Sequence, residues 1–336
     1  MILVTGATGL VGSHLLLGLL EDNQKVRAIY RSTASLHKTK SLFHDYNKAS
    51  LYDAIEWIQA DITDVPSLEN AFVNVSQVYH CAALISFDPN DEQILRKTNI
   101  EGTANVVNFC LAHDIQKLCY VSSVAALGDL KEFETTVTEA TEWNPELTHS
   151  DYAISKYGAE MEVWRAQQEG LAVNVVNPGI IIGPGFWHSG SGQLFTQVAH
   201  GLPFFSKGIS GFVGVTDVVK IMMLSMKSLN TGARFIVVAQ NISYEEIVKS
   251  IASALKVKMP TIYAKPWMTE IYWRIDALLS AVCNRKRVMS KSMARALHQS
   301  HQYSNEKVKS ELGFEFRDIG ECIIETTKYY PKKNNL

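Results

Sequence analysis

A glycine-spaced turn near residue 1 constrains the fold of this chain more than any other feature. Residues 1–5 form an apolar, β-branched run that predicts a buried strand. Gly6, Gly9 and Gly12 follow with the spacing G-x-x-G-x-x-G, and residues 13–20 have the apolar density of a helix. Such a turn lets the backbone approach a pyrophosphate, and the helix N-terminus adds N–H groups and a positive dipole. The segment therefore predicts a dinucleotide site that includes Thr8, Leu10 and Val11.

Strand-like and helix-like segments alternate over the first two hundred residues. The predicted strands are 25–30, 54–60, 76–83, 117–123 and 172–177, and the predicted helices include 65–72, 91–113 and 152–170. This alternation predicts an α/β, doubly wound parallel sheet with its ligand across the carboxyl ends of the strands. Beyond Pro178, Gly- and Pro-rich loops precede a mainly helical pattern. We predict an NADP-binding domain of residues 1–178 plus 216–240 and a smaller, mainly helical substrate lobe of 179–215 plus 241–336.

The end of the second predicted strand indicates which dinucleotide binds. Arg31 and Ser32 stand there, and no Asp or Glu occurs between Lys25 and Phe43. An acidic residue would accept a hydrogen bond from a free ribose 2′-hydroxyl, whereas an arginine suits a 2′-phosphate. The residues favour NADP(H); NAD(H) is the alternative if Arg31 is a solvated loop charge.

Three polar residues predict carbonyl chemistry at the same edge of the sheet. Tyr152 and Lys156 are four residues apart and share one face of a predicted helix. A nearby cation favours the phenolate and lowers the pKa of a tyrosine toward the range for proton transfer. Ser123 ends the fifth predicted strand, where its hydroxyl can bind a substrate oxygen. Lys156 can also hold the ribose hydroxyls of a nicotinamide cofactor.

Bulk properties exclude several other classes of protein. A net charge of −2 over 336 residues gives no basic field for nucleic acid. The five cysteines are scattered without Cys-x-x-Cys or a His/Cys cluster, which predicts reduced thiols and no metal site. The first strand begins at Met1 and leaves no room for a signal peptide, so we expect a cytoplasmic protein.

The ordered set of motifs resembles the extended short-chain dehydrogenases/reductases, which share the Rossmann fold. The motifs are the glycine turn, Asp61-Ile62, His80-Cys81-Ala82-Ala83, Asn99-Ile100-Glu101-Gly102-Thr103, Val121-Ser122-Ser123, Tyr152-x-x-x-Lys156 and Asn177-Pro178-Gly179. Residues 26–31 are similar to the branch that holds dihydroflavonol-4-reductase and 3β-hydroxysteroid-dehydrogenase-like proteins.

The resemblance implies a role for each motif. Ser123, Tyr152 and Lys156 correspond to the catalytic triad of the family. Asp61 and Ile62 correspond to the adenine site, and Pro178, Gly179 and Ile181 to the nicotinamide site. The remaining positions implied on the cofactor side are Ala82, Ala83, Asn99, Val121 and Ser122, with Asn99 at a position usually assigned to structure or to a proton-relay water.

Three reaction classes compete with simple hydride transfer. A dehydratase of this family carries carboxylates beside the catalytic hydroxyl, whereas residues 124–127 here are Val-Ala-Ala-Leu. A nucleotide-sugar epimerase has an arginine before the segment that begins at Phe212, where Ser210 and Gly211 stand here. Other arginines could substitute, so the epimerase stays the first alternative. A non-catalytic NADP sensor is the second, although such relatives often lose the Tyr/Lys pair that this chain keeps.

The predicted substrate is an apolar carbonyl compound or alcohol. Seven aromatic residues of the lobe can line a pocket for it or form the lobe core: Phe186, Trp187, Phe204, Phe205, Trp267, Tyr272 and Trp273. Residues 267–283 predict an amphipathic aromatic helix, followed by a basic run at 285–287. Because Glu270, Arg274 and Asp276 interrupt it, this helix should not span a membrane. We expect it to pack into the lobe, and contact with a membrane surface is the alternative. The family resemblance is compatible with a homodimer.

Overall fold

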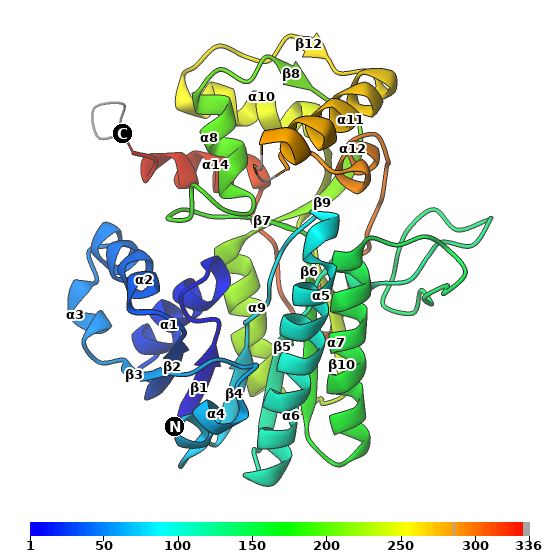
Figure 1. Cartoon of the computed structure of the whole chain (residues 1–336). Helices are drawn as coiled ribbons and strands as arrows, with labels where there is room; N and C mark the ends of the chain where they lie inside the picture. The colour runs from blue at the N-terminus through cyan, green and yellow to red at the C-terminus, as the bar shows by residue number, and fades with distance from the viewer. Residues whose placement is uncertain (284, 286, 332–336) are drawn as a thin grey trace.

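The structure, a computed structural model, describes residues 1–283, 285 and 287–331. Lys286, in the predicted basic run, and the last five residues of the predicted lobe lie outside the described residues. Within the described chain, a large sheet with its helices forms the lower part of the molecule in Figure 1. The remaining elements lie above it, beyond the carboxyl ends of the strands.

Seven parallel strands pair in the order β10-β6-β5-β4-β1-β2-β3. They are β1 (Ile2–Thr5), β2 (Val26–Tyr30), β3 (Glu56–Gln59), β4 (Gln77–His80), β5 (Lys117–Val121), β6 (Val173–Pro178) and β10 (Ala233–Val237). The chain order reverses between β1 and β4, and open α/β sheets bind ligands at such a switch point. The predicted doubly wound α/β sheet is confirmed.

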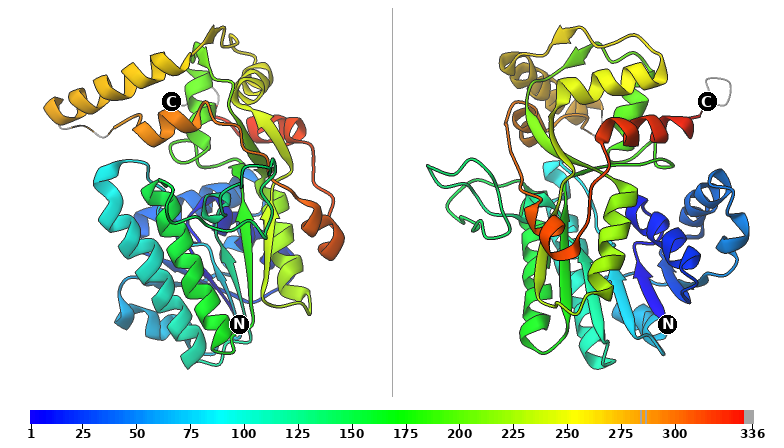
Figure 2. Two further views of the ribbon diagram at one scale, coloured as in Figure 1. Left: turned by 90° about the vertical axis from the view of Figure 1, so that its right-hand side faces the viewer. Right: turned by 180° about the vertical axis from the view of Figure 1, so that it is seen from behind.

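Helices cover both faces of this sheet (Figure 2). One core contains α4 (Val65–Phe72), α6 (Gly102–Ala112) and α7 (Asp151–Gln168); the other contains α1 (Leu10–Glu21) and α9 (Val215–Lys227). Ile2 and Val4 enter the second core and Leu3 the first, because successive side chains of a strand point to opposite faces. The apolar run at residues 2–4 therefore fills both layers.

The helix predicted over 91–113 consists of several pieces. The 3₁₀ turn η1 (Pro89–Asp91) leads into α5 (Glu92–Leu95), the π-helical turn η2 (Arg96–Glu101) and then α6. The buried Asn99 lies in the π-helical turn. Such turns frequently occur at functional sites.

The upper part has its own core around a small sheet of order β11-β9-β7. Its strands are β7 (Ile180–Ile182), β9 (Ile209–Gly214) and β11 (Gln240–Ser243), and its helices are α8 (Gly192–Ala199), α10 (Tyr244–Leu255) and α14 (Ile319–Lys328). A second small sheet pairs β8 (Phe204–Phe205) with β12 (Ile262–Tyr263). Two further helices, α11 (Pro266–Cys283) and α12 (Lys291–Ala296), pack on each other at the outer end.

One C-terminal helix returns to the large sheet. In α13 (Glu306–Leu312), the buried Val308 joins the core that contains α1, α9 and β10, as does Phe314 just beyond it. The predicted substrate lobe of 179–215 plus 241–336 therefore includes a segment that packs on the cofactor side. None of the described helices combines the length and the apolar composition that crossing a bilayer requires.

Candidate active site

The glycine turn forms the floor of the predicted cofactor site. Gly6 has a positive φ of 65°, and a Cβ there would overlap with the backbone of Cys81 and Ala82. A Cβ on Gly12 would overlap with the Gly6 carbonyl. A Cβ on Gly9 would meet only the Gly6 oxygen, at 3.4 Å, and its φ of −101° suits any residue. The fold itself requires Gly6 and Gly12, whereas Gly9 keeps the N-terminus of α1 open toward a ligand.

A chain of buried hydrogen bonds supports this turn from below. The hydroxyl of Thr5 lies 2.6 Å from Nδ1 of His80, and Nε2 of His80 lies 3.0 Å from the hydroxyl of Thr103. The Ala82 amide donates to Thr5 Oγ1 at 3.2 Å. Burial lowers the pKa of His80 to about 3, with the charge of Lys156 acting in the same direction. His80 is therefore neutral at physiological pH, and this support does not titrate.

The residues that are predicted to contact the adenosine of the cofactor lie around the ends of β2 and β3. Arg31 is exposed directly after β2, and no ion pair among the described residues uses it. Asp61 accepts hydrogen bonds from the amide and hydroxyl of Thr63, both at 2.9 Å. The buried Ile62 packs under Gly102, where a Cβ would meet its side chain at 2.7 Å.

Ser123 and Tyr152 meet at the carboxyl end of β5. Ser123 caps the 3₁₀ turn η3 (Val124–Ala126), and its Oγ accepts from the Ala125 amide at 3.1 Å. Ser150 caps α7, which places Tyr152 in its first turn. Burial raises the pKa of Tyr152 above its usual value, while the neighbouring Ser123 hydroxyl acts on it in the opposite direction. The structure thus brings the serine and the tyrosine together.

Lys156 lies one turn further along α7 but is directed inward. Its side chain is 1% exposed, and Nζ donates to the hydroxyl of Tyr120 at 2.9 Å and to the carbonyl of Val121 at 2.8 Å. Burial lowers the pKa of Lys156 to about 7 against the opposing charge of Glu160. The expectation that a nearby cation lowers the pKa of Tyr152 is wrong in this geometry, because burial dominates and raises it.

A buried carboxylate, which the sequence analysis missed, lies beneath the site. Oε2 of Glu160 accepts from the Ser122 hydroxyl at 2.6 Å and from Asn177 Nδ2 at 2.9 Å, and Oε1 pairs with Nε of Arg234 at 2.8 Å. Asn177 also donates to the Ser123 carbonyl at 3.0 Å. Ser122, predicted on the cofactor side, therefore directs its hydroxyl into the fold. Glu160 follows Lys156 by four residues, so the spacing that identified Tyr152 and Lys156 could have found it.

Asn99 holds the loop that follows β4. Its Oδ1 accepts from the Leu84 amide at 2.7 Å, and Nδ2 donates to the Leu84 carbonyl at 3.0 Å and to Ser155 Oγ at 2.9 Å. Ser155 in turn donates to the Tyr152 carbonyl at 2.8 Å. With both amide donors in use, Asn99 positions the loop against α7. This loop carries Phe87, whose ring centroid lies 5.5 Å from that of Tyr152, a neighbour that no sequence motif indicated.

The predicted nicotinamide segment lies where the large sheet passes into the upper part. Pro178 ends β6, and Gly179 follows where a Cβ would overlap with the Gly211 carbonyl. The carbonyl of Ile181 in β7 accepts from the Ser191 hydroxyl. The lobe aromatics do not gather at Tyr152: Phe186 is buried, Trp187 packs on Phe195 and Tyr330, and Phe204, Trp267 and Tyr272 are exposed.

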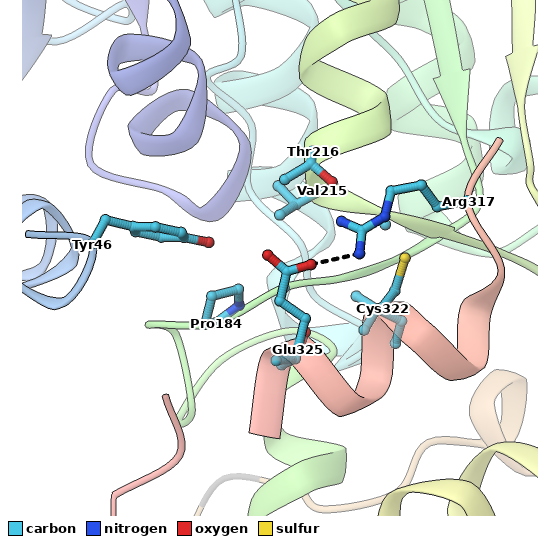
Figure 3. Close-up of a pocket in the computed structure, with 11 residues that line it drawn as sticks. Tyr46, Pro184, Val215, Thr216, Arg317, Cys322 and Glu325 are labelled. Carbon is cyan, nitrogen blue, oxygen red and sulfur yellow. Dashed lines mark ion pairs between the residues drawn. The ribbon is translucent and has the colours of Figure 1, made fainter. Parts of the chain in front are cut away.

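A small cavity, about 10 Å³ in volume and thus of the size that holds one water, lies elsewhere between the two parts (Figure 3). Tyr46, Pro184, Val215 and Thr216 line it, together with Arg317 and Glu325, whose charged groups pair at 2.6 Å. None of the predicted site residues lines this cavity, so it is separate from the candidate site.

We compared the chain with known protein families, curated proteins and solved structures. The model of the NAD dependent epimerase/dehydratase family matches residues 2–239. A putative dihydroflavonol 4-reductase of Synechocystis sp. is 25% identical over 335 residues, which cover 97% of this chain and 93% of the relative. Sterol demethylase protein B of Methylococcus capsulatus is 30% identical over 249 residues, 74% of this chain and 72% of the relative. The crystal structure of gox2253 superposes with a TM-score of 0.81 at 26% identity, covering 98% of this chain and 97% of that one.

Proposed function

The chain belongs to the NAD dependent epimerase/dehydratase family, and on that premise we propose that it reduces ketones or aldehydes, or oxidises the corresponding alcohols, with NADP(H). It is an NAD(P)-dependent oxidoreductase of the extended short-chain type. The observation that carries the finer proposal is the meeting of the Ser123 and Tyr152 hydroxyls at the carboxyl end of β5, one helical turn from Lys156. We keep residues 1–178 plus 216–240 as the cofactor domain, and we add α13 to it.

The residues at the glycine turn fit a dinucleotide. Gly9 leaves the first turn of α1 open, and its neighbours Thr8, Leu10 and Val11 would contact the pyrophosphate through the backbone. Arg31 stands where it would hold a 2′-phosphate, and no acidic side chain stands beside it in the sequence. These features support NADP(H) over NAD(H). When bound, such a cofactor supplies hydride transfer to or from the substrate carbon.

Side chains of this protein would bind the substrate oxygen and supply the proton. The Ser123 hydroxyl binds the carbonyl oxygen of the substrate, and Tyr152 donates its phenolic proton to that oxygen. Because burial raises the pKa of Tyr152, the phenol carries the proton that it would donate at neutral pH. Lys156 has a pKa of about 7 and can be charged when the phenolate forms, which stabilises the developing negative charge.

An aromatic side chain beside Tyr152, and exposed aliphatic side chains nearby in the sequence of that aromatic residue, support an apolar substrate. Phe87 lies against its ring, and Ile85 on the same loop and Ile94 on α5 are more than half exposed, at 58% and 52%. Exposed aliphatic side chains at a ligand-binding edge favour the burial of apolar ligand surface. The alternative of a nucleotide-sugar epimerase lacks support at β9, where Gly211 packs against Val238 and Tyr303 and offers no cation for a diphosphate.

The test of the mechanism is Tyr152→Phe, with Tyr157→Phe on the same helix as the matched control. We expect the first variant to lose turnover by about a thousandfold or more while it still binds NADPH, and the control to stay active. To find the substrate, NADPH oxidation is measured with aromatic, steroid-like and aliphatic carbonyl compounds, and nucleotide sugars are assayed in parallel. Near-normal activity of Tyr152→Phe, or nucleotide-sugar conversion without net NADPH consumption, would contradict the proposal.

The cofactor assignment has its own test. Arg31→Asp should move the preference from NADPH toward NADH by at least tenfold, whereas Lys25→Asp, at the opposite end of β2, should not change it. Gly9→Ala should fold with an unchanged melting temperature and bind NADPH more weakly, because only the ligand needs the space of the missing methyl. An unchanged NADPH/NADH ratio in Arg31→Asp would refute the role of that residue.

A further inference from the structure

Helix α11 exposes its apolar side to solvent and buries its polar side. Its buried residues are Thr269, Asp276 and Ser280, which face α12 and the turn that follows α11. The exposed side carries seven large apolar residues: Trp267, Ile271, Tyr272, Ile275, Leu278, Leu279 and Val282. The expectation that the apolar side packs into the lobe is wrong, because hydrogen bonds of the polar side hold the helix in place.

The apolar residues form a continuous strip. At roughly 100° per residue, all seven lie within an arc of about 140°, opposite the buried side. Exposure along the strip is high, at 61% for Trp267, 67% for Leu278 and 76% for Val282. The helix projects from the body of the molecule, with α12 between it and the large sheet (Figure 2). The strip therefore faces outward and away from the candidate active site.

The polar residues that interrupt the segment do not interrupt the strip. Asp276 accepts hydrogen bonds from the amides of Val288 and Met289 at 2.8 and 3.0 Å and from Arg285 at 2.6 Å. Glu270 pairs with Arg274 at 2.7 Å, and both lie outside the apolar arc. The three residues that argue against a membrane-spanning helix therefore leave the strip free to contact a membrane surface.

The same end of the molecule is strongly basic. Residues 256–295 contain nine lysines and arginines and two acidic residues, a local net charge of +7 in a chain whose net charge is −2. Exposed cations include Lys258 and Lys265 before α11 and Lys291 and Arg295 after it. Met259 and Ile262, which precede α11 in the chain, are exposed as well.

We propose that this face, the α11 strip with its flanking lysines and arginines, docks on the surface of an anionic lipid bilayer. A helix with an aromatic and aliphatic side, flanked by cations, suits the boundary between headgroups and acyl chains, and each basic residue near an anionic surface adds attraction. A second copy of this chain is less suited to cover the strip, because two such faces would bring their flanking lysines and arginines together and repel each other. The helix lies in the interface and does not cross it.

The experiment is flotation of the full chain with vesicles of phosphatidylcholine alone or mixed with phosphatidylglycerol. We expect binding to the anionic vesicles, release by high salt, and at least a tenfold loss in the double variant Ile271→Glu/Leu278→Glu. Leu229→Glu, at a residue 98% exposed beyond α9, is the matched control and should bind like the wild type. Lys258→Glu/Lys291→Glu should weaken binding to anionic vesicles in the same direction.

Folding and cofactor binding are measured on the same variants. An unchanged melting temperature and unchanged NADPH binding in Ile271→Glu/Leu278→Glu would assign its loss of flotation to the surface itself. The proposal is overturned if the wild type does not float with anionic vesicles or if the double variant floats equally well. It is also overturned if the wild type is a dimer in solution that the double variant dissociates, since a second copy would then cover the strip.

Discussion

Helices α7 and α11 are equally long, at 18 residues each, and both turn polar side chains inward. On α7 the buried Lys156 and Glu160 meet partners from β5, β6 and β10 at the edge where the ligand is proposed to bind. On α11 the partners of the buried Asp276, among the residues that the structure describes, are Arg285, Val288 and Met289, which follow the helix in the chain. The buried polar side chains of α7 support the proposed reaction site, whereas those of α11 hold the helix in place and leave its apolar side exposed.

The largest effect is expected for Lys156, and it tests whether the buried polar side chains of α7 contribute to turnover rather than to stability. Lys156→Met should lower turnover by about a thousandfold, roughly 4 kcal/mol of transition-state stabilisation. The pKa of Lys156 is about 7 in the folded protein and near its ordinary value, well above 7, in the unfolded chain. The unfolded state therefore binds more protons between these values, so the stability contributed by Lys156 rises with pH.

Urea unfolding at several pH values measures whether the stability contributed by Lys156 rises with pH. Relative to Lys156→Met, the wild type should gain roughly 2–3 kcal/mol of unfolding free energy between about pH 6 and about pH 9. A difference between the two proteins that does not change with pH would show that Lys156 is not desolvated as the structure indicates.

The next effect concerns the buried carboxylate of α7. Glu160→Leu leaves Arg234, Ser122 and Asn177 without their shared acceptor, and we expect a loss of about 3–5 kcal/mol in the free energy of unfolding. Glu162→Leu, whose carboxylate pairs with Arg165 on a partly exposed surface, should cost less than about 1 kcal/mol. Equal losses in the two variants would remove the distinction between the buried and the exposed carboxylate.

A smaller effect is expected from the anchor of α11. Asp276→Ala removes the acceptor for the Val288 and Met289 amides and should destabilise this turn by about 1–3 kcal/mol. Hydrogen exchange at these two amides measures the change, and turnover of a soluble substrate should not alter. Loss of turnover in Asp276→Ala would mean that α11 contributes to the chemistry after all.

The smallest effect lies on the exposed strip. Leu278→Gln should change the free energy of unfolding by no more than about 0.5 kcal/mol, because its side chain contacts solvent in the folded and the unfolded states. Thermal unfolding of the soluble protein measures this. A clear destabilisation would show that the strip is covered in solution.

The sequence predicts the sheet well because each of its signals is local. The apolar run at 2–4, the glycines at 6, 9 and 12 and the strand ends at Arg31 and Ser123 act through neighbouring residues, and the structure places them at one edge. Spacing can place Glu160 on the same helix face as Lys156, but the partners of Glu160 and Tyr120 lie far away in the chain, so no local pattern predicts what these side chains contact. The burial of Asp276 likewise depends on Arg285, Val288 and Met289, and the sequence of α11 taken alone predicts a helix with an inward apolar side.

The ion pair between Glu160 and Arg234 also has a consequence during protein synthesis. Glu160 leaves the ribosome well before Arg234, which belongs to β10 and follows β7, β9 and α9 in the chain. At a translation rate of about 5–20 residues per second, Arg234 is synthesised roughly 4–15 s after Glu160. We expect the nascent sheet to remain unpaired at its β6 edge during that interval, until β10 is translated.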